Sequence, residues 1–271
     1  MRALRNAFLS PGSRLFGPGF SRDYLRFAWH ARNMNSTGPG SLDVAGFRVD
    51  YGNQSHALFL LHEIFVNAEY DFDTRAARPR IIDCGANIGM AVLFFKARYP
   101  NADVLAFEPN PASFERLVRN IEANGLESVQ TERAAVTDHA GTARLYRDPN
   151  DPASVVASLD RLWGGSLGED VRGVRLSDRI TAPVDFLKID VEGGEYAVVR
   201  DLVSTGAVRW VREAVIEFHQ IAGQPDATDC MTDALKAAGF DLSVRTSAVS
   251  PSGLIRARRP DEVRVKAEPR A

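Results

Sequence analysis

The sequence predicts a doubly wound α/β fold, in which helices cover both faces of a mostly parallel sheet of seven strands. Short apolar runs alternate with helical patterns along most of the chain. Most of these runs are apolar on both faces, as strands buried inside a parallel sheet are. Ligands bind beyond the carboxyl ends of such strands. Polar residues that end the apolar runs therefore mark the predicted site: Asp83, Glu108, Asp190 and His219.

Composition narrows the function classes. The chain has 271 residues, of which 45% are hydrophobic, enough for one sizeable domain with small additions. A net charge of -2 is unlike that of a general nucleic-acid binder, which is usually strongly basic. No segment reaches the roughly 18 apolar residues of a membrane helix, and the N-terminus lacks a signal-peptide core, so a cytoplasmic protein is predicted. Cys84 and Cys230 are expected to be buried free thiols, because no CxxC pair is present.

Residues 1–45 are predicted to form an N-terminal helical extension to a main domain over 46–258, with 259–271 as a flexible tail. Glycine and proline clusters flank one short helix in the extension, at Arg22–Arg32. Its mixture of aromatic and basic residues leaves three interpretations: a helix packed on the domain, a lid over the substrate, or a contact with a membrane surface. Apolar residues at helical spacing predict a further helix at Ser55–Val66.

Regular alternation of strands and helices begins after Pro79. Proline stops or starts helices at Pro100 and Pro111, and Gly125 follows a helix end. The elements predicted in this half are a strand at Arg80–Asp83, a tight loop at Gly85–Gly89, a helix at Met90–Tyr99, a strand at Val104–Phe107, a helix at Pro111–Asn124 and a strand at Val129–Val136.

The second half continues the alternation and ends in a predicted antiparallel hairpin. A glycine-rich stretch over 147–170 is predicted to be a mobile loop. The other predicted elements are a short strand at Thr142–Tyr146, a strand at Val184–Ile189, a helix at Glu195–Thr205, a strand at Ala214–Phe218, a helix at Ala227–Ala238, and the hairpin strands Phe240–Val244 and Gly253–Ala257.

The loop that follows the first strand of the alternation has the features of a nucleoside site. Gly85 permits a sharp turn with backbone N–H groups facing a ligand, and Gly89 permits close approach of helix and strand. The helix that starts there favours a carboxylate at its N-terminus. Asn87 and Met90 stand where a dinucleotide site would need glycine, and no Lys-Ser/Thr pair of a nucleotide-triphosphate loop is present.

Glu108 ends the next strand, where an acid can accept both hydroxyls of an unphosphorylated ribose. A glycine loop and a strand-end acid without a diphosphate motif indicate a nucleoside such as S-adenosyl-L-methionine.

Seven motifs, in order between about residues 47 and 245, resemble the FkbM family of methyltransferases. The string Lys-Ile-Asp-Val-Glu-Gly at 188–193 is the strongest marker. Gly194 departs from the family, which often has alanine there, and residues 1–45 are not covered. The motifs are Glu63–Tyr70, Ile81–Gly89, Ala106–Asn110, Asn120–Leu126, Arg175–Asp178, Asp185–Gly193 and Ile216–His219.

This resemblance implies a class I methyltransferase fold and, usually, O-methylation of sugars, polyketides or related natural products. It also implies that Ala134 and Ala135 lie along the adenine, and that Asp190 lies near the methionine amino group or the reacting methyl. The further residues implied to bind the cofactor are Asp83, Gly85, Ala86, Asn87, Gly89, Glu108, Pro109 and Asn110.

Methyl transfer from a sulfonium depends mainly on alignment, but a hydroxyl acceptor also gains from a general base. The candidate catalytic residues are Asp190, Glu192 and His219. His219 could instead be a hydrogen-bonded structural histidine, and Glu192 could cap the following helix. Lys188 shares a strand face with Asp190 and is interpreted as its ion-pair partner.

Two further features stay open. No metal is predicted, although Asp190, Glu192, Glu217 and His219 could together offer ligands to a divalent cation. Trp163 in the glycine-rich loop could stack on an acceptor ring or be pinned to the surface.

Three functions compete. The first is an O-methyltransferase that acts on a hydroxyl of a small glycoside or polyketide. The second is a methyltransferase with a carboxylate, amine, peptide or RNA acceptor; Asp-Val-Glu-Gly at 190–193 replaces the Asn/Asp-Pro-Pro-aromatic motif of nucleic-acid amino methylases. The third is a non-catalytic adenosyl-binding protein. A small-molecule acceptor, no nucleic acid and no integral membrane segment are predicted, and a homodimer is left open.

Overall fold

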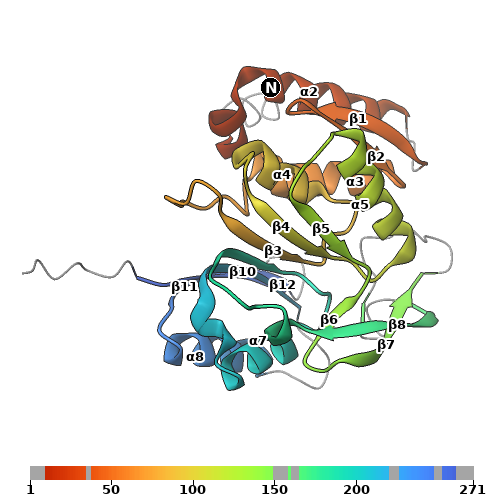
Figure 1. Cartoon of the computed structure of the whole chain (residues 1–271). Helices are drawn as coiled ribbons and strands as arrows, with labels where there is room; N and C mark the ends of the chain where they lie inside the picture. The colour runs from red at the N-terminus through yellow and green to blue at the C-terminus, as the bar shows by residue number, and fades with distance from the viewer. Residues whose placement is uncertain are drawn as a thin grey trace, which may run out of the picture.

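The computed structural model describes residues 10–34, 38–148, 158–159, 165–219, 226–246 and 252–260. A seven-stranded sheet in the order β11-β12-β10-β9-β3-β4-β5 forms its centre (Figure 1). The five strands from β10 to β5 are parallel, whereas β12 is antiparallel to both β10 and β11. The strands are β3 (Arg80–Cys84), β4 (Asp103–Phe107), β5 (Val129–Glu132), β9 (Val184–Ile189), β10 (Val211–His219), β11 (Asp241–Thr246) and β12 (Ser252–Arg258). The predicted sheet and its C-terminal antiparallel hairpin are confirmed.

Helices cover both faces of this sheet. Figure 1 shows α3 (Gln54–Leu60), α4 (Met90–Arg98) and α5 (Pro111–Ala123) on one side, and α7 (Glu195–Ser204) and α8 (Ala227–Ala237) on the other. Successive strand residues point to opposite faces, so Ile81 packs in the cluster with α4 while Ile82 packs in the cluster with α7. The short 3-10 helices η2 (Leu176–Asp178) and η3 (Ala207–Trp210) complete the second side.

The N-terminal segment is packed against the domain. Helix α2 (Pro11–Met34) begins earlier than predicted and is interrupted at Gly17, whose φ of 79° is not helical. Phe16 and Phe20 of α2 pack on Phe65 and Phe94, with ring centroids 5.4–6.0 Å apart. These contacts favour the interpretation of a packed helix.

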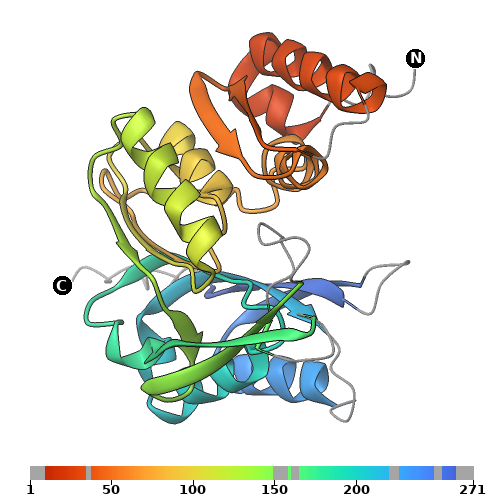
Figure 2. The same ribbon diagram turned by 90° about the vertical axis from the view of Figure 1, so that its right-hand side faces the viewer.

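A hairpin of β1 (Gly40–Val44) and β2 (Phe47–Tyr51) joins α2 to the domain (Figure 2). Asn120 of α5 accepts a hydrogen bond from the backbone N–H of Asp50 at 2.7 Å, and Asn124 accepts one from Arg48 at 2.8 Å. The domain boundary predicted between residues 45 and 46 falls in the turn of this hairpin.

The helix predicted at Ser55–Val66 has two geometries. Asn53 caps its start by accepting hydrogen bonds from Ser55 and His56. After α3 ends at Leu60, the chain continues as the π-helix η1 (Leu61–Val66). Such wider turns are rare and occur frequently at functional sites.

The strand predicted at Val129–Val136 was wrong in extent. It divides into β5 and β6 (Ala135–Thr137), and β6 belongs to a separate sheet of order β6-β8-β7. That sheet also contains β7 (Gly141–Arg147) and β8 (Leu167–Arg175), so residues 167–170 of the predicted loop form a strand. Residues 149–157 and 160–164, with Trp163, lie outside the described residues.

The two cysteines differ from each other. Cys84 is buried at the end of β3, as predicted, but Cys230 is exposed on α8, so that part of the prediction was wrong. Across the described part of the chain, no helix combines the length and apolar character needed to cross a bilayer.

Candidate functional site

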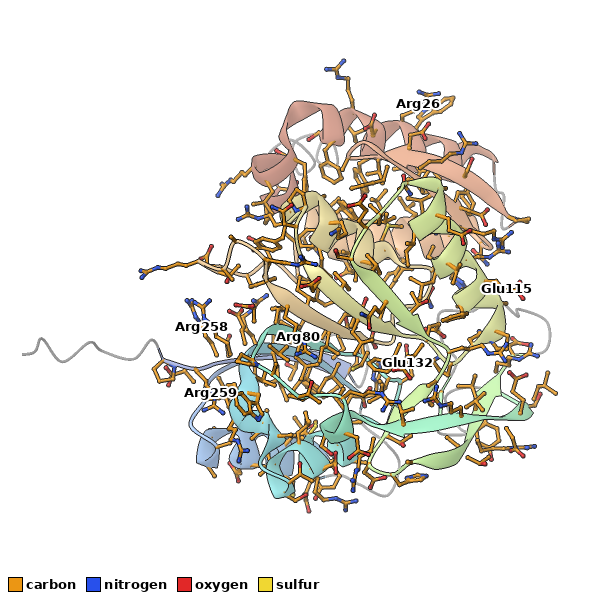
Figure 3. All side chains as sticks on the ribbon, viewed as in Figure 1. Arg26, Arg80, Glu115, Glu132, Arg258 and Arg259 are labelled. Atoms are coloured by element: carbon orange, nitrogen blue, oxygen red, sulfur yellow. The ribbon has the colours of Figure 1, made fainter. Side chains whose placement is uncertain are left out.

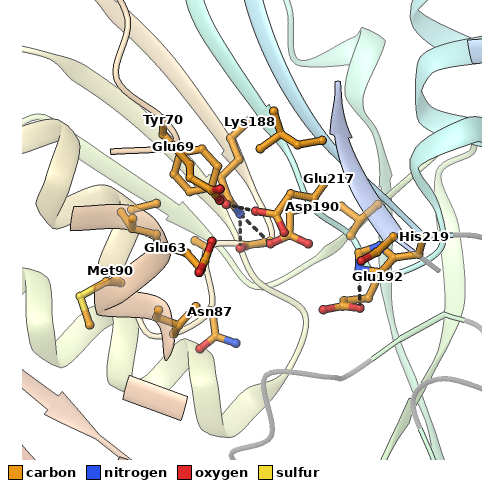
Figure 4. Close-up of a pocket in the computed structure, with 18 of the residues that line it drawn as sticks. Glu63, Glu69, Tyr70, Asn87, Met90, Lys188, Asp190, Glu192, Glu217 and His219 are labelled. Carbon is orange, nitrogen blue, oxygen red and sulfur yellow. Dashed lines mark hydrogen bonds and ion pairs between the residues drawn. The ribbon is translucent and has the colours of Figure 1, made fainter. Parts of the chain in front are cut away.

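A cavity of about 540 Å³ opens at the carboxyl ends of the parallel strands (Figure 4). Its lining is described in two halves, which are named for the ligands that they are proposed to bind. The cofactor half contains Gly85, Ala86, Asn87, Glu108, Pro109, Ala134, Ala135 and Val136. The acceptor half contains Phe59, Glu63, Asn67, Glu69, Tyr70, Glu217, Arg245, Thr246 and Ser252–Leu254. Lys188, Asp190, Glu192 and His219 also line the cavity.

The glycine loop is held against two strand ends. The backbone N–H groups of Gly85 and Ala86 donate to the carbonyl of Phe107 at 3.0 and 2.8 Å. Gly85 has a φ of 87°, and a Cβ there would lie 1.8 Å from the carbonyl oxygen of Asp190. Only glycine fits this crossing of two backbones. The sharp turn predicted at Gly85 is confirmed, but the prediction that its N–H groups face a ligand was wrong, because those of Gly85 and Ala86 are bonded to Phe107. Gly89 and Asn110 lie at the starts of α4 and α5 and do not line the cavity.

Glu108 connects the second strand end to the loop. Its carboxylate accepts hydrogen bonds from the backbone N–H groups of Asn87 and Asn110, each at 2.8 Å. Burial raises the pKa of Glu108 to about 7 in spite of these bonds. Each carboxylate oxygen has a second lone pair, so the side chain can still accept hydroxyl groups from the cavity.

Lys188 is a buried lysine in the wall of the cavity. Its Nζ is 3.3 Å from Oδ1 of Asp83 and 3.2 Å from Oδ2 of Asp190, and it donates to the carbonyl of Gly85 at 2.9 Å. Burial lowers the pKa of Lys188, but the charges of both aspartates outweigh it and raise the pKa. The predicted ion pair with Asp190 is confirmed. Asp83 is fully buried and meets the site through Lys188, without lining the cavity.

His219 is held between two carboxylates, of which Figure 4 shows that of Glu192. Nδ1 lies 3.1 Å from Oε1 of Glu195, and Nε2 lies 3.3 Å from Oε2 of Glu192. Burial lowers the pKa of His219, but the hydrogen bond and charge of Glu195, with the charges of Glu192 and Asp190, raise it to about 10. The ring is therefore a cation at neutral pH. Glu195, which the sequence analysis missed, also accepts from the backbone N–H of Gly193.

Asp190, Glu192 and His219 have ligand atoms within 4.8 Å of one another, in the part of the chain that the structure describes. Both nitrogens of His219 face carboxylates. Glu217, the fourth ligand considered in the sequence, is not a member of this set.

The acceptor half joins segments that are far apart in the sequence. Glu63 comes from η1, and Glu69 and Tyr70 follow it. Glu69 forms an ion pair with Arg245 of β11, and the Tyr70 hydroxyl donates to Oε1 of Glu217 on β10. In the sequence, Glu63–Tyr70 stood out only as a family motif, and its place in the cavity wall and the π-helix before it were not predicted.

Sequence comparisons give one family and several relatives. The family described as Methyltransferase FkbM domain matches residues 83–242. The chain is 30% identical to methyltransferase sdnD of Sordaria araneosa, covering 76% of this chain and 91% of that protein. It is 32% identical to 31-O-demethyl-FK506 methyltransferase FkbM of Streptomyces tacrolimicus, covering 66% and 80%. It is 28% identical to hexuronic acid methyltransferase AglP of Haloferax volcanii, covering 56% and 61%.

Proposed function

Because the chain belongs to the FkbM methyltransferase family, we propose that it methylates a hydroxyl group of a small natural product. Family membership confirms the resemblance read from the motifs, the methyltransferase activity and S-adenosyl-L-methionine as the cofactor. Bound in the cavity, this cofactor supplies a methyl group that is already activated on a sulfonium. The protein must then bind and align the two substrates and accept one proton from the acceptor.

The cofactor half fits an adenosyl group. Glu108 would accept the ribose hydroxyls. The N–H groups of Gly85, Ala86 and Asn87 are already bonded to Phe107 and Glu108, so this loop would hold the ligand by its shape and by the positive end of α4. Pro109, Ala134 and Ala135 offer small apolar surfaces to the adenine. Gly89 and Asn110 would act indirectly, by starting the helices α4 and α5 beside these contacts. Asp83 would act indirectly through its ion pair with Lys188.

Asp190, Glu192 and His219 would act where the two halves meet. Asp190 can hold the cationic end of the cofactor, because its carboxylate borders the cavity. His219 would fix Glu192 by their ion pair, so its role is to orient a carboxylate. Its place between two acids leaves no free ring nitrogen to take a proton from an acceptor.

The observation that carries the hydroxyl assignment is the charge of the acceptor half. Glu63, Glu69 and Glu217 line it, and carboxylates there would repel a carboxylate acceptor while accepting hydrogen bonds from hydroxyl groups. The printed name of one relative, 31-O-demethyl-FK506 methyltransferase, supports methyl transfer to an oxygen atom.

The test is product chemistry with a labelled methyl donor. The purified protein is incubated with matched panels of polyketide and glycoside alcohols, carboxylic acids and amines. The label should enter the alcohols, and the product should survive alkali, because an ether is stable where a methyl ester is hydrolysed. Label released by alkali, or label confined to amines, would refute O-methylation of a hydroxyl while leaving methyltransferase activity intact.

A further inference from the structure

The three acid–base candidates drawn from the sequence are each paired with an opposite charge. Asp190 has Lys188 at 3.2 Å, and Glu192 has His219 at 3.3 Å. His219 itself lies between Glu192 and Glu195. An opposite charge at this distance favours the charged form of a group. It keeps the imidazole protonated and engages both carboxylates with a cation, although burial raises the pKa of Glu192 to about 8.

Glu217 has a different partner. Its Oε1 accepts a hydrogen bond from the neutral hydroxyl of Tyr70, and Oε2 makes no hydrogen bond or ion pair among the described residues. Tyr70 is fully buried, and burial raises the pKa of its phenol well above the ordinary value, so it stays a donor. Figure 4 shows both side chains in the cavity close-up, Glu217 near Asp190 and Tyr70 near Lys188.

The environment of Glu217 suits proton transfer near neutral pH. Burial, with the charges of Asp190 and Glu69, raises the pKa of Glu217 to about 8, against the opposing effects of Lys188 and Tyr70. A general base works best when its pKa is close to the operating pH.

Strand register places Glu217 at one end of a row of side chains. Glu217 of β10 pairs with Leu254 of β12, and Leu254 pairs with Arg245 of β11. Directly paired residues share one face of a sheet, and all three line the cavity. This acceptor row, Glu217–Leu254–Arg245, therefore runs from a carboxylate across an apolar side chain to a cation.

We propose that Glu217 is the catalytic base that takes the proton of the acceptor hydroxyl, that Tyr70 is its positioning residue, and that the acceptor lies along the acceptor row. This assignment rests on the proposed O-methylation. It selects an alcohol with an apolar surface and no carboxylate beside the reacting hydroxyl.

The transfer balances with these groups alone. The acceptor oxygen forms a bond to the methyl carbon as the carbon–sulfur bond breaks, and that bond's electron pair stays on sulfur. The hydroxyl proton moves to Oε2 of Glu217, and Glu217 later releases it to water. No oxidant, reductant or metal ion takes part.

The first test replaces Glu217 by Gln, which keeps an oxygen for the Tyr70 hydroxyl. We expect kcat with an alcohol acceptor to fall about 10²–10⁴-fold, while cofactor affinity from titration calorimetry and the melting temperature stay close to wild type. Glu115→Gln is the matched control, because Glu115 lies exposed on α5 (Figure 3). A Glu217→Gln protein that folds and retains kcat would overturn the proposal.

The second test uses Tyr70→Phe and a pH profile, which a purely structural role would not move. The Tyr70 hydrogen bond lowers the pKa of Glu217, so its loss should shift the acid limb of kcat/KM to higher pH. An unshifted limb would refute the positioning role, even if Glu217→Gln cannot be folded. Wild-type product that is cleaved by alkali would instead show that the proposed function itself is wrong.

Discussion

The two halves of the cavity are built in different ways. The cofactor half is largely backbone: N–H groups of one short loop, bonded to Phe107 and Glu108 across neighbouring strand ends. The acceptor half is made of side chains from η1, β10 and β11, and its central bond joins residues 147 positions apart. A common ligand can be held by a rigid loop, whereas a variable acceptor is selected by side chains that can change without altering the fold.

The largest expected effect comes from the backbone crossing of the cofactor half. In Gly85→Ala, the new Cβ would lie 1.8 Å from the carbonyl oxygen of Asp190 at a positive φ. We expect the free energy of unfolding to fall by about 2–5 kcal/mol and cofactor binding to be lost, as measured by urea unfolding and calorimetry.

Gly125→Ala is the control for this experiment. Gly125 also has a positive φ, of 58°, but nothing lies within 4 Å of the added Cβ. It should cost about 1–2 kcal/mol and leave cofactor affinity unchanged. Equal effects of the two substitutions would contradict the importance of the crossing.

Glu108→Ala should weaken cofactor binding next most. It removes the proposed ribose acceptor and leaves the N–H groups of Asn87 and Asn110 without their carboxylate. Losing its hydrogen bonds to the ribose should cost about 1–3 kcal/mol, which is a roughly 5- to 150-fold loss of affinity in calorimetry. Glu132→Gln is the control, because Glu132 also ends a strand but does not line the cavity (Figure 3). Unchanged affinity in Glu108→Ala would remove Glu108 from the cofactor half.

Stability should depend on pH through the buried groups of both halves. Burial raises the pKa of Glu108 to about 7, and that of Glu192 and Glu217 to about 8. These carboxyls bind protons more tightly when folded, so folding is disfavoured as pH rises from about 5 through 8. His219 stabilises the fold below about 6.5 and loses this contribution as pH rises through its folded pKa of about 10.

Both effects have the same sign. The free energy of unfolding of the cofactor-free protein, measured in urea, should therefore fall from about pH 6 to about pH 9. A free energy that rises over this interval would contradict the assigned protonation of His219 and the three glutamates.

The smallest effect is expected at the rim of the acceptor half. Arg245 is largely exposed and pairs with Glu69, and exposed pairs contribute about 0–1 kcal/mol. Arg245→Ala should raise the acceptor KM about two- to fivefold and leave cofactor affinity unchanged. Arg144→Ala, which breaks an exposed pair with Asp170 on the small sheet, should change neither. Weakened cofactor binding in Arg245→Ala would show that the two halves are not separable.

The sequence predicts the cofactor half of the cavity better than the acceptor half. The Gly85 loop and Glu108 stand beside strand ends that apolar runs mark, so the sequence alone predicted that they meet at one edge of the sheet. β8 was missed because Leu167–Arg175 is mostly polar and lies on a small, partly exposed sheet. The π-helical turn at η1 and the contact of Tyr70 with Glu217 depend on tertiary packing, which no local pattern encodes. The contacts of His219 with Glu192 and Glu195 also depend on tertiary packing, so the sequence did not predict them.

A crystal structure with S-adenosylhomocysteine, the demethylated cofactor product, would test the division of the cavity most directly. The ribose hydroxyls should lie within hydrogen-bond distance of Glu108, with the sulfur directed past Asp190 toward Glu217. A ribose bound away from Glu108, or a sulfur directed away from the acceptor row, would contradict it.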